Sequence, residues 1–202
     1  MRAQCLMICL LIAAATGFIA SHAVSQDQDP DKMAEMMQMW QKYATPGEHH
    51  QELARFIGKW DIDSKIFMEP GAPPMTSKGS AEFKWLMPNR WPAQEFKGSM
   101  MGMPYSGFGI TGYDNYKKKY RQVWIDSIST TMLNSEGVVV DPKGQVQVLY
   151  GPMDEYLTGE HDKTVKYVTR IIDQDNFVFE IWDMGIGPDG GMVIELTYTR
   201  QK

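Results

Sequence analysis

The chain has 202 residues, with 20 basic and 25 acidic side chains and a net charge of −5. A mildly acidic protein has no general attraction for nucleic acid or anionic lipid, so we expect no nucleic-acid partner. Both cysteines, Cys5 and Cys9, lie near the N-terminus. If that segment is removed, no thiol is left for a disulfide, a zinc site or a nucleophile. A core built from about 175 residues can stabilise one domain without such links.

Residues 1–25 are expected to be a signal peptide. Arg2 precedes an apolar run that ends near Ala20, and the small residues that follow suit cleavage after Ala23 or Ser25. The run is shorter than the roughly 20 residues of a membrane-spanning helix, and no basic segment follows it, which disfavours a retained anchor. We therefore expect an exported protein, periplasmic or extracellular, with no stable membrane insertion after cleavage.

Residues 26–58 predict a helical lead made of two short helices. In the first helix, Asp29 can cap the N-terminus and Pro30 suits the first helical position. We expect one apolar face of this helix to dock on the rest of the protein. The residues of that face recur at helical spacing: Met33, Met36, Met37, Trp40 and Ala44.

The second helix is expected to start at Thr45-Pro46-Gly47-Glu48. The threonine would cap it, the proline would take the first turn, and the glutamate would complete a capping box. Gly58 is placed to end this helix. It also opens the triplet Gly58-Lys59-Trp60, with which many ligand-binding barrels begin. We expect Trp60 to be structural and to close the bottom of such a barrel.

Residues 59–202 predict an antiparallel β domain. From Trp60 onward, apolar and polar residues alternate and turn sequences recur. Strands joined by such short turns form an up-and-down meander, and closing it into a barrel leaves room for about one small ligand. A two-sheet sandwich is the alternative architecture. Ten strands are expected near residues 59–68, 76–87, 93–100, 105–113, 119–129, 131–140, 145–150, 163–172, 177–183 and 192–200.

Five segments stand out in chain order, at residues 45–50, 68–74, 100–104, 109–114 and 124–127. Together they resemble motifs of the uncharacterised bacterial family catalogued as domain of unknown function 1579, from about residue 36 to residue 200. That family is usually grouped with calycin-like, or lipocalin-like, barrels, so the resemblance implies a barrel of that class. It implies no substrate, cofactor or catalytic residue.

Two segments match sequence patterns that are typical of nucleotide or nucleic-acid sites. Residues 107–112 have the spacing Gly-x-Gly-x-x-Gly, but no apolar helix follows, so we interpret them as a strand that bends sharply or lets a ligand approach its backbone. Lys117, Lys118 and Lys119 form a basic run between two tyrosines. We expect this run to lie on a solvated strand edge, where lysines discourage association between sheets.

Histidine and methionine clusters are candidate ligand contacts. His49 and His50 would point about 100° apart on a helix and could not easily share a metal ion, so we expect them to pack at the mouth of the barrel or to contact a ligand or haem. Met101 and Met103 belong to a methionine cluster. Thioethers of this kind can bind Cu(I), but adaptable packing or a promiscuous apolar pocket is the favoured interpretation, and no metal ligand is assigned.

The other candidates are polar or aromatic residues on predicted strands. If they point inward, they place a few polar groups in an apolar cavity, and the arginines could bind a carboxylate; if they point outward, they are ordinary surface residues. They are Arg121, Trp124, Asp126, Arg170, Glu180 and Trp182.

The sequence has no Gly-x-Ser-x-Gly elbow, no His-Glu-x-x-His and no close Glu-x-x-His pair, so no catalytic residue is assigned. The favoured function is binding of a small, largely apolar molecule inside the barrel. One alternative is an enzyme that uses an interior carboxylate or histidine as acid or base. The other is a structural or interaction protein whose barrel is plugged by Trp60, Phe83, Trp85 and Trp124. The sequence specifies neither a cofactor nor an oligomeric state.

Overall fold

The computed structural model describes residues 29–69, 71–156 and 158–202. The expected signal peptide at 1–25 lies outside this range. The chain divides into two compact units, with the boundary between Met39 and Trp40. None of the helices in the described ranges is long and apolar enough to cross a membrane.

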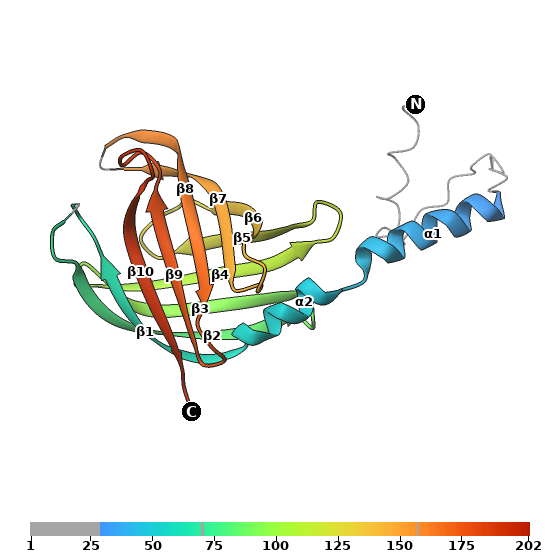
Figure 1. Ribbon diagram of the computed structural model, residues 1–202, viewed down its shortest axis with the longest axis horizontal. Helices are drawn as coiled ribbons and strands as arrows, with labels where there is room; N and C mark the ends of the chain where they lie inside the picture. The colour runs from blue at the N-terminus through green and yellow to red at the C-terminus, as the bar shows by residue number, and fades with distance from the viewer. Residues whose placement is uncertain (1–28, 70, 157) are drawn as a thin grey trace, which may run out of the picture. The chain divides into compact units, whose positions relative to one another are not determined.

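The N-terminal helix α1 (Pro30–Ala44) begins as its sequence predicts (Figure 1). Asp29 Oδ1 accepts a hydrogen bond from the Asp31 N–H at 3.1 Å, which satisfies one of the free donors of the first turn. Docking of the Met33 face stays a prediction.

The expected pair of helices is wrong in number, because only α1 is a helix of several turns. The next element is the short α2 (Glu48–Glu52), which continues as the 3₁₀ turn η2 (Leu53–Phe56). The cap also differs: Gly47, not Thr45, precedes the first turn, and its N–H donates to His50 Nδ1 at 3.1 Å. Thr45 instead follows the end of α1, where its N–H and its hydroxyl both donate to the Gln41 carbonyl, at 3.0 and 2.7 Å.

Ten antiparallel strands form one closed barrel, which confirms the predicted strand number and excludes the sandwich. The last strand pairs with the first, with Ile62 opposite Tyr198, so no edge is left open. The strands are β1 (Gly58–Ile66), β2 (Met75–Met87), β3 (Trp91–Met100), β4 (Met103–Asp114), β5 (Lys119–Asp126), β6 (Leu133–Val139), β7 (Val146–Glu155), β8 (Glu160–Ile171), β9 (Asn176–Asp183) and β10 (Gly191–Arg200).

The basic run does not lie on a strand edge. Lys117 and Lys118 form the hairpin turn between β4 and β5, where Asp114 Oδ1 accepts the Lys117 N–H at 2.9 Å. Lys119 begins β5 and its ammonium group lies 2.7 Å from Glu136 Oε1. The expectation of an edge was wrong because closure of the barrel pairs every strand on both sides.

The glycine-rich segment is part of β4 and contains no helix start. A Cβ added to Gly107 would lie 2.0 Å from the Trp124 ring, and one added to Gly109 would lie 2.7 Å from it. The two glycines therefore leave space for an indole that crosses the strand.

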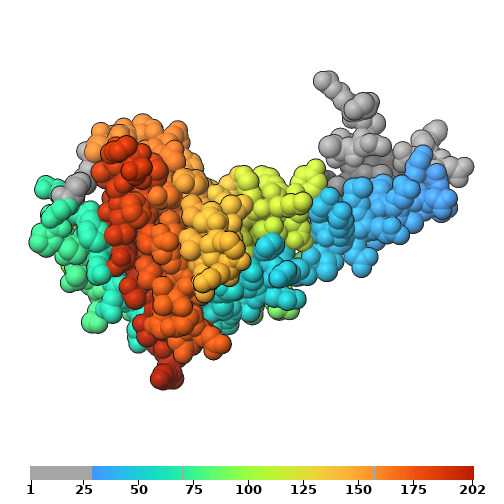
Figure 2. All heavy atoms as spheres, viewed as in Figure 1, coloured from blue at the N-terminus to red at the C-terminus, as the bar shows by residue number. Residues whose placement is uncertain are grey.

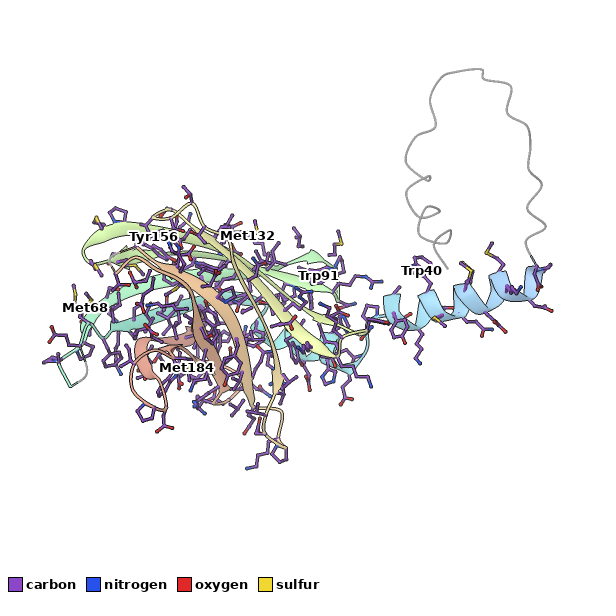
Figure 3. The ribbon with its side chains drawn as sticks, turned by 90° about the horizontal axis from the view of Figure 1, so that it is seen from above. Trp40, Met68, Trp91, Met132, Tyr156 and Met184 are labelled. Atoms are coloured by element: carbon purple, nitrogen blue, oxygen red, sulfur yellow. The ribbon has the colours of Figure 1, made fainter. Side chains whose placement is uncertain are left out.

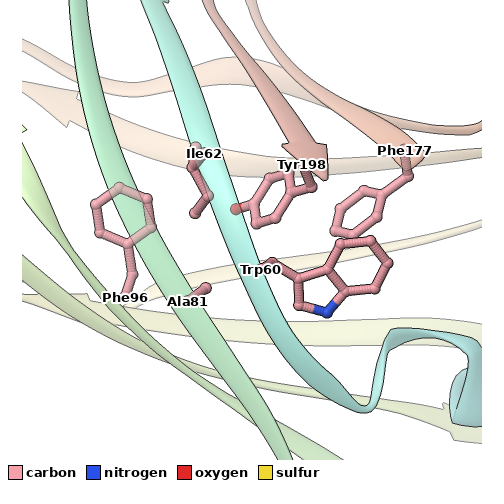
Figure 4. Packing of buried hydrophobic residues seen from close by; sticks show 6 residues of the cluster. All are labelled: Trp60, Ile62, Ala81, Phe96, Phe177 and Tyr198. Atoms are coloured by element: carbon pink, nitrogen blue, oxygen red, sulfur yellow. The ribbon is translucent and has the colours of Figure 1, made fainter. Parts of the chain in front are cut away.

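A buried aromatic cluster packs the interior beside β1 (Figure 4). The rings of Phe177 and Tyr198 stack at 4.1 Å between centroids, and Trp60 meets Phe177 edge to face at 4.8 Å. Burying such side chains contributes roughly 1.5–3 kcal/mol each. This cluster holds β1, β9 and β10 together where the barrel closes.

Candidate functional site

We call the end of the barrel at Gly58 and Arg200, beneath η2, the closed end. Trp60 is fully buried there, and its indole N–H donates to the Phe56 carbonyl at 2.7 Å. The Arg200 guanidinium lies 4.1 Å above the Trp60 ring and donates to the Ile57 carbonyl at 2.8 Å. Arg200 thus joins the last strand, the first strand and the 3₁₀ turn.

Gly58 begins β1 one residue after η2 has ended, and its backbone conformation favours glycine. Its φ is +128°, and an added Cβ would lie 2.8 Å from Arg200 Nη1. Backbone with positive φ is unfavourable for residues that carry a Cβ. The triplet Gly58-Lys59-Trp60 is therefore a structural feature of the closed end.

Both histidines of α2 lie at this closed end, and neither lines the cavity of the barrel interior. The Tyr120 hydroxyl donates to Glu52 Oε2 at 2.7 Å and lies 3.2 Å from His49 Nδ1. His50 is buried, and burial lowers its pKa. The placement of these histidines at the mouth was wrong because α2 and η2 cover the opposite end.

The interior holds a cavity of about 260 Å³. Ile128 lines it and is itself 50% exposed, so the cavity reaches the surface at the open end, where β5 ends. The barrel is therefore not plugged. The cavity is lined mainly by apolar side chains, among them Phe56, Phe83, Phe96, Trp124, Leu133, Met153, Phe177, Phe179, Ile181, Ile194 and Leu196.

One wall of the cavity carries a row of uncharged polar side chains. Thr111, Gln122 and Ser135 lie directly opposite one another on β4, β5 and β6. Gln147 and Thr169 form a second such pair on β7 and β8. Across the described part of the chain, no side-chain hydrogen bond joins any of these five to another protein group. They are free to bond to a molecule in the cavity.

Two tyrosines in the cavity wall differ in their hydrogen bonding. The Tyr198 hydroxyl accepts a hydrogen bond from Gln94 Nε2 at 2.9 Å. The Tyr167 residue is only 6% exposed, and its hydroxyl is buried with no partner among the described residues. Burial raises the pKa of Tyr167 to about 12, so the group is a neutral donor. An unbonded buried hydroxyl costs about 1–3 kcal/mol unless a ligand or water satisfies it.

Asp126 is the one charged residue among the described residues that line the cavity. Its Oδ1 accepts the backbone N–H groups of Ile128 and Ser129 at 3.0 and 2.9 Å, which shapes the loop after β5. Trp124 donates its indole N–H to the Tyr105 hydroxyl at 3.1 Å. Burial, together with the nearby negative charge of Asp126, raises the pKa of Tyr105.

Four sequence candidates point out of the barrel instead of into it. Arg121 lies 3.8 Å from Glu136 on the neighbouring strand. On β8 and β9, which lie side by side in the outer wall of Figure 2, Glu180 accepts from Arg170 Nε at 2.7 Å and from Trp182 Nε1 at 2.8 Å. The inward arginine fork therefore does not form, and Glu180 is a buried carboxylate of the outer face. Trp124 and Asp126 do line the cavity.

Met101 and Met103 lie in and beside the turn between β3 and β4, 47% and 56% exposed, and neither lines the cavity. Met100 and Met153 line it instead. Met68 and Met184 also lie toward the open end, opposite Trp91 (Figure 3). Within residues 29–69, 71–156 and 158–202, no cluster of three or more histidine, aspartate and glutamate side chains could hold a metal ion.

A family model described as "Protein of unknown function (DUF1579)" matches residues 45–200, which include α2, η2 and the whole barrel. The chain belongs to the DUF1579 family. This match confirms the resemblance inferred from the five sequence motifs. A search of curated proteins found no match to this DUF1579 chain.

Among solved structures, Rv2717c from M. tuberculosis has a TM-score of 0.57 and 15% identity, over 78% of the DUF1579 chain and all of its own. At this identity the likeness shows the fold alone. A de novo designed fluorescence-activating β-barrel has a TM-score of 0.41 and 13% identity, over 73% of this chain and 95% of its own. The redesigned barrel mFAP0, bound to DFHBI, has 0.40 and 11%, over 72% and 99%. These two scores are too low to support an argument.

Several cavity residues of this DUF1579 chain were missed by sequence reasoning. Tyr105, Tyr167 and Gln147 lie on predicted strands. Two-residue periodicity places each of them on the same face of its strand as the residues two positions before and after it. Nothing in the sequence showed which face points inward. Tyr167 and Arg170, both on β8, differ in parity and so face opposite sides.

Proposed function

We propose that the protein is an exported, calycin-like barrel that binds a small, largely apolar molecule in its interior. The observation that carries this proposal is an interior cavity of about 260 Å³ in which several polar side chains, among them Gln122 and Tyr167, have no hydrogen-bond partner among the described residues. Binding sites for small molecules combine apolar walls with a few polar groups that fix orientation. A buried hydroxyl without a partner, such as that of Tyr167, is costly, and a ligand would remove that cost.

The size of the cavity supports a ligand rather than a packing defect. An engineered apolar cavity of about 150 Å³ is large enough to bind benzene. The cavity of about 260 Å³ is larger and has an opening beside Ile128. We therefore propose a ligand larger than one aromatic ring that enters at the open end.

Native mass spectrometry of protein purified from its own host compartment tests this function. We expect a bound small molecule on the wild-type protein and its loss in Ser135→Trp, which fills the cavity from β6. Asn134→Trp, on the exposed side of the same strand, is the matched control and should keep the ligand. A wild-type protein that is consistently empty would contradict the proposal.

Sequencing of the mature N-terminus would test export, with Val24 or Gln26 expected as first residue.

A further inference from the structure

We propose that the cavity selects an uncharged two-ring aromatic molecule with a polar edge, and that it rejects carboxylates. This inference rests on the proposed function and specifies the ligand of the same cavity. It differs from the arginine-bound carboxylate that the sequence left open.

The charge of the cavity wall argues against an anionic ligand. Asp126 is the one charged residue in the lining, and no arginine, lysine or histidine of the described chain belongs to it. A buried carboxylate placed near Asp126 would lose its hydration and gain only repulsion, because no cation compensates it. Arg121 and Arg170 are engaged with glutamates on the outer face.

The apolar wall favours a flat aromatic molecule. The rings of Phe56, Phe83 and Phe177 lie close to one another, with centroids 5.1 to 6.3 Å apart. Phe96 and Trp124 continue this surface along the cavity, 6.4 Å apart. Aromatic rings gain from offset or edge-to-face contacts with further rings. A ligand with rings would extend this arrangement, while a flexible acyl chain would lose conformational entropy and gain no ring contact.

Uncharged polar side chains lie on the wall formed by β4, β5 and β6. Thr111, Gln122 and Ser135 form one lateral row of donors and acceptors without protein partners. The neutral Tyr167 hydroxyl adds a buried donor from β8. These groups suit hydroxyl or carbonyl oxygens on one edge of a ligand, which can both donate and accept hydrogen bonds.

Isothermal titration calorimetry at pH 7.5 with naphthalene, 2-naphthol and 2-naphthoate tests the inference. We expect naphthalene to bind and 2-naphthol to bind about two- to tenfold tighter, the gain of one net hydrogen bond. We expect 2-naphthoate to bind at least about tenfold more weakly than naphthalene, because its charge would be buried without a cation.

Two variants assign these preferences to residues. Gln122→Leu should remove the advantage of 2-naphthol over naphthalene, and a far-UV circular dichroism spectrum like that of wild type would show that the variant is folded. Asp126→Asn, which keeps an oxygen for the Ile128 and Ser129 N–H groups, should bring 2-naphthoate closer to naphthalene. Arg121→Gln, on the outer face of the same strand, should change none of the three affinities.

The outcomes separate this inference from the function on which it rests. If 2-naphthoate binds wild type as tightly as 2-naphthol does, selection for uncharged molecules is overturned and the cavity remains a binding site. If 2-naphthol binds no tighter than naphthalene, the polar edge is overturned. If none of the three probes binds a folded wild-type protein, the two-ring aromatic ligand is overturned, and the binding function itself fails only if native mass spectrometry also finds the protein empty.

Discussion

The closed end and the midsection of the barrel differ in whether their polar side chains are hydrogen-bonded to protein. At the closed end, Trp60, Arg200 and Tyr120 all bond to carbonyl or carboxylate groups of α2, η2 or the residue after it. In the midsection, Gln122 and Tyr167 face a cavity and bond to no described protein group. Satisfied polar groups fix a structure, and unsatisfied ones offer binding energy to a ligand. Polar side chains thus bond to protein at the closed end, and unbonded ones lie around the cavity, where we propose that a ligand binds.

The largest expected effect comes from breaking the closed end. Trp60→Ala should lower the free energy of unfolding by about 3–5 kcal/mol, because it removes a buried indole and leaves a cavity. Urea denaturation measures this. Leu86→Ala, at a side chain that is 56% exposed, is the control and should change stability by less than about 0.5 kcal/mol. Similar losses in both variants would show that Trp60 does not organise this end.

A smaller loss is expected from Gly58→Ala. The substitution forces a Cβ onto backbone with positive φ, at a cost of about 1–3 kcal/mol, and crowds Arg200. The crowding should vanish when the change is made in Arg200→Ala, so a double-mutant cycle separates it from backbone strain. Strictly additive effects would mean that the guanidinium moves aside without cost.

Tyr198 and Tyr167, the one hydrogen-bonded and the other not, test most directly whether polar groups of the cavity wall contribute to stability. Tyr198→Phe should cost about 1 kcal/mol of stability, because Gln94 loses its partner. Tyr167→Phe should leave stability unchanged or raise it by about 1 kcal/mol, since it removes a buried hydroxyl that has no protein partner. Thermal and urea unfolding of ligand-free protein would measure both. Equal losses would contradict the assignment of Tyr167 to ligand binding.

The smallest effect is a dependence of stability on pH at the closed end. Burial lowers the pKa of His50 in the folded protein below its ordinary value of 6.5. Between these two pKa values the unfolded chain binds more protons than the folded protein does. The contribution of neutral His50 to stability is therefore complete above pH 6.5 and is lost as pH falls below it. Burial acts to raise the pKa of Glu52, but hydrogen bonding with Tyr120 and His49 and the charges of His49 and Arg55 outweigh it, so the pKa is lowered. This adds a loss of stability of the same sign below pH 4.5.

Urea denaturation between pH 7.5 and 5.5 would measure the His50 contribution. His50→Gln keeps an acceptor for the Gly47 N–H and should flatten the slope over this range. Wild-type protein that is more stable at pH 5.5 than at 7.5 would contradict the predicted sign.

Much of the fold could be predicted because it rests on local signals. The two-residue alternation after Gly58 and the turn sequences between strands predicted ten strands, and all ten exist within a few residues of the expected bounds. The second helix was predicted less well. The cap predicted at Thr45 was wrong, because the Thr45 hydroxyl bonds to the Gln41 carbonyl at the end of α1, and Gly47 and His50 form the cap instead.

The candidate site could be predicted only in part, because periodicity does not state which face of a strand points inward. On β9, Phe177, Phe179 and Ile181 line the cavity, although the other face carries Val178 and Trp182 and is apolar too. Glu180 was a candidate for the interior, but Arg170 and Trp182 hold it on the outside.

By itself, the sequence determined the family, the number of strands and the structural role of Gly58 and Trp60. These features depend on backbone preferences and side-chain patterns that act over a few residues. Only the tertiary structure decided that the meander closes, which face is interior and that Tyr167 has no protein partner. Each of these depends on contacts between strands distant in the chain, such as the pairing of β1 with β10, and local periodicity carries no information about them.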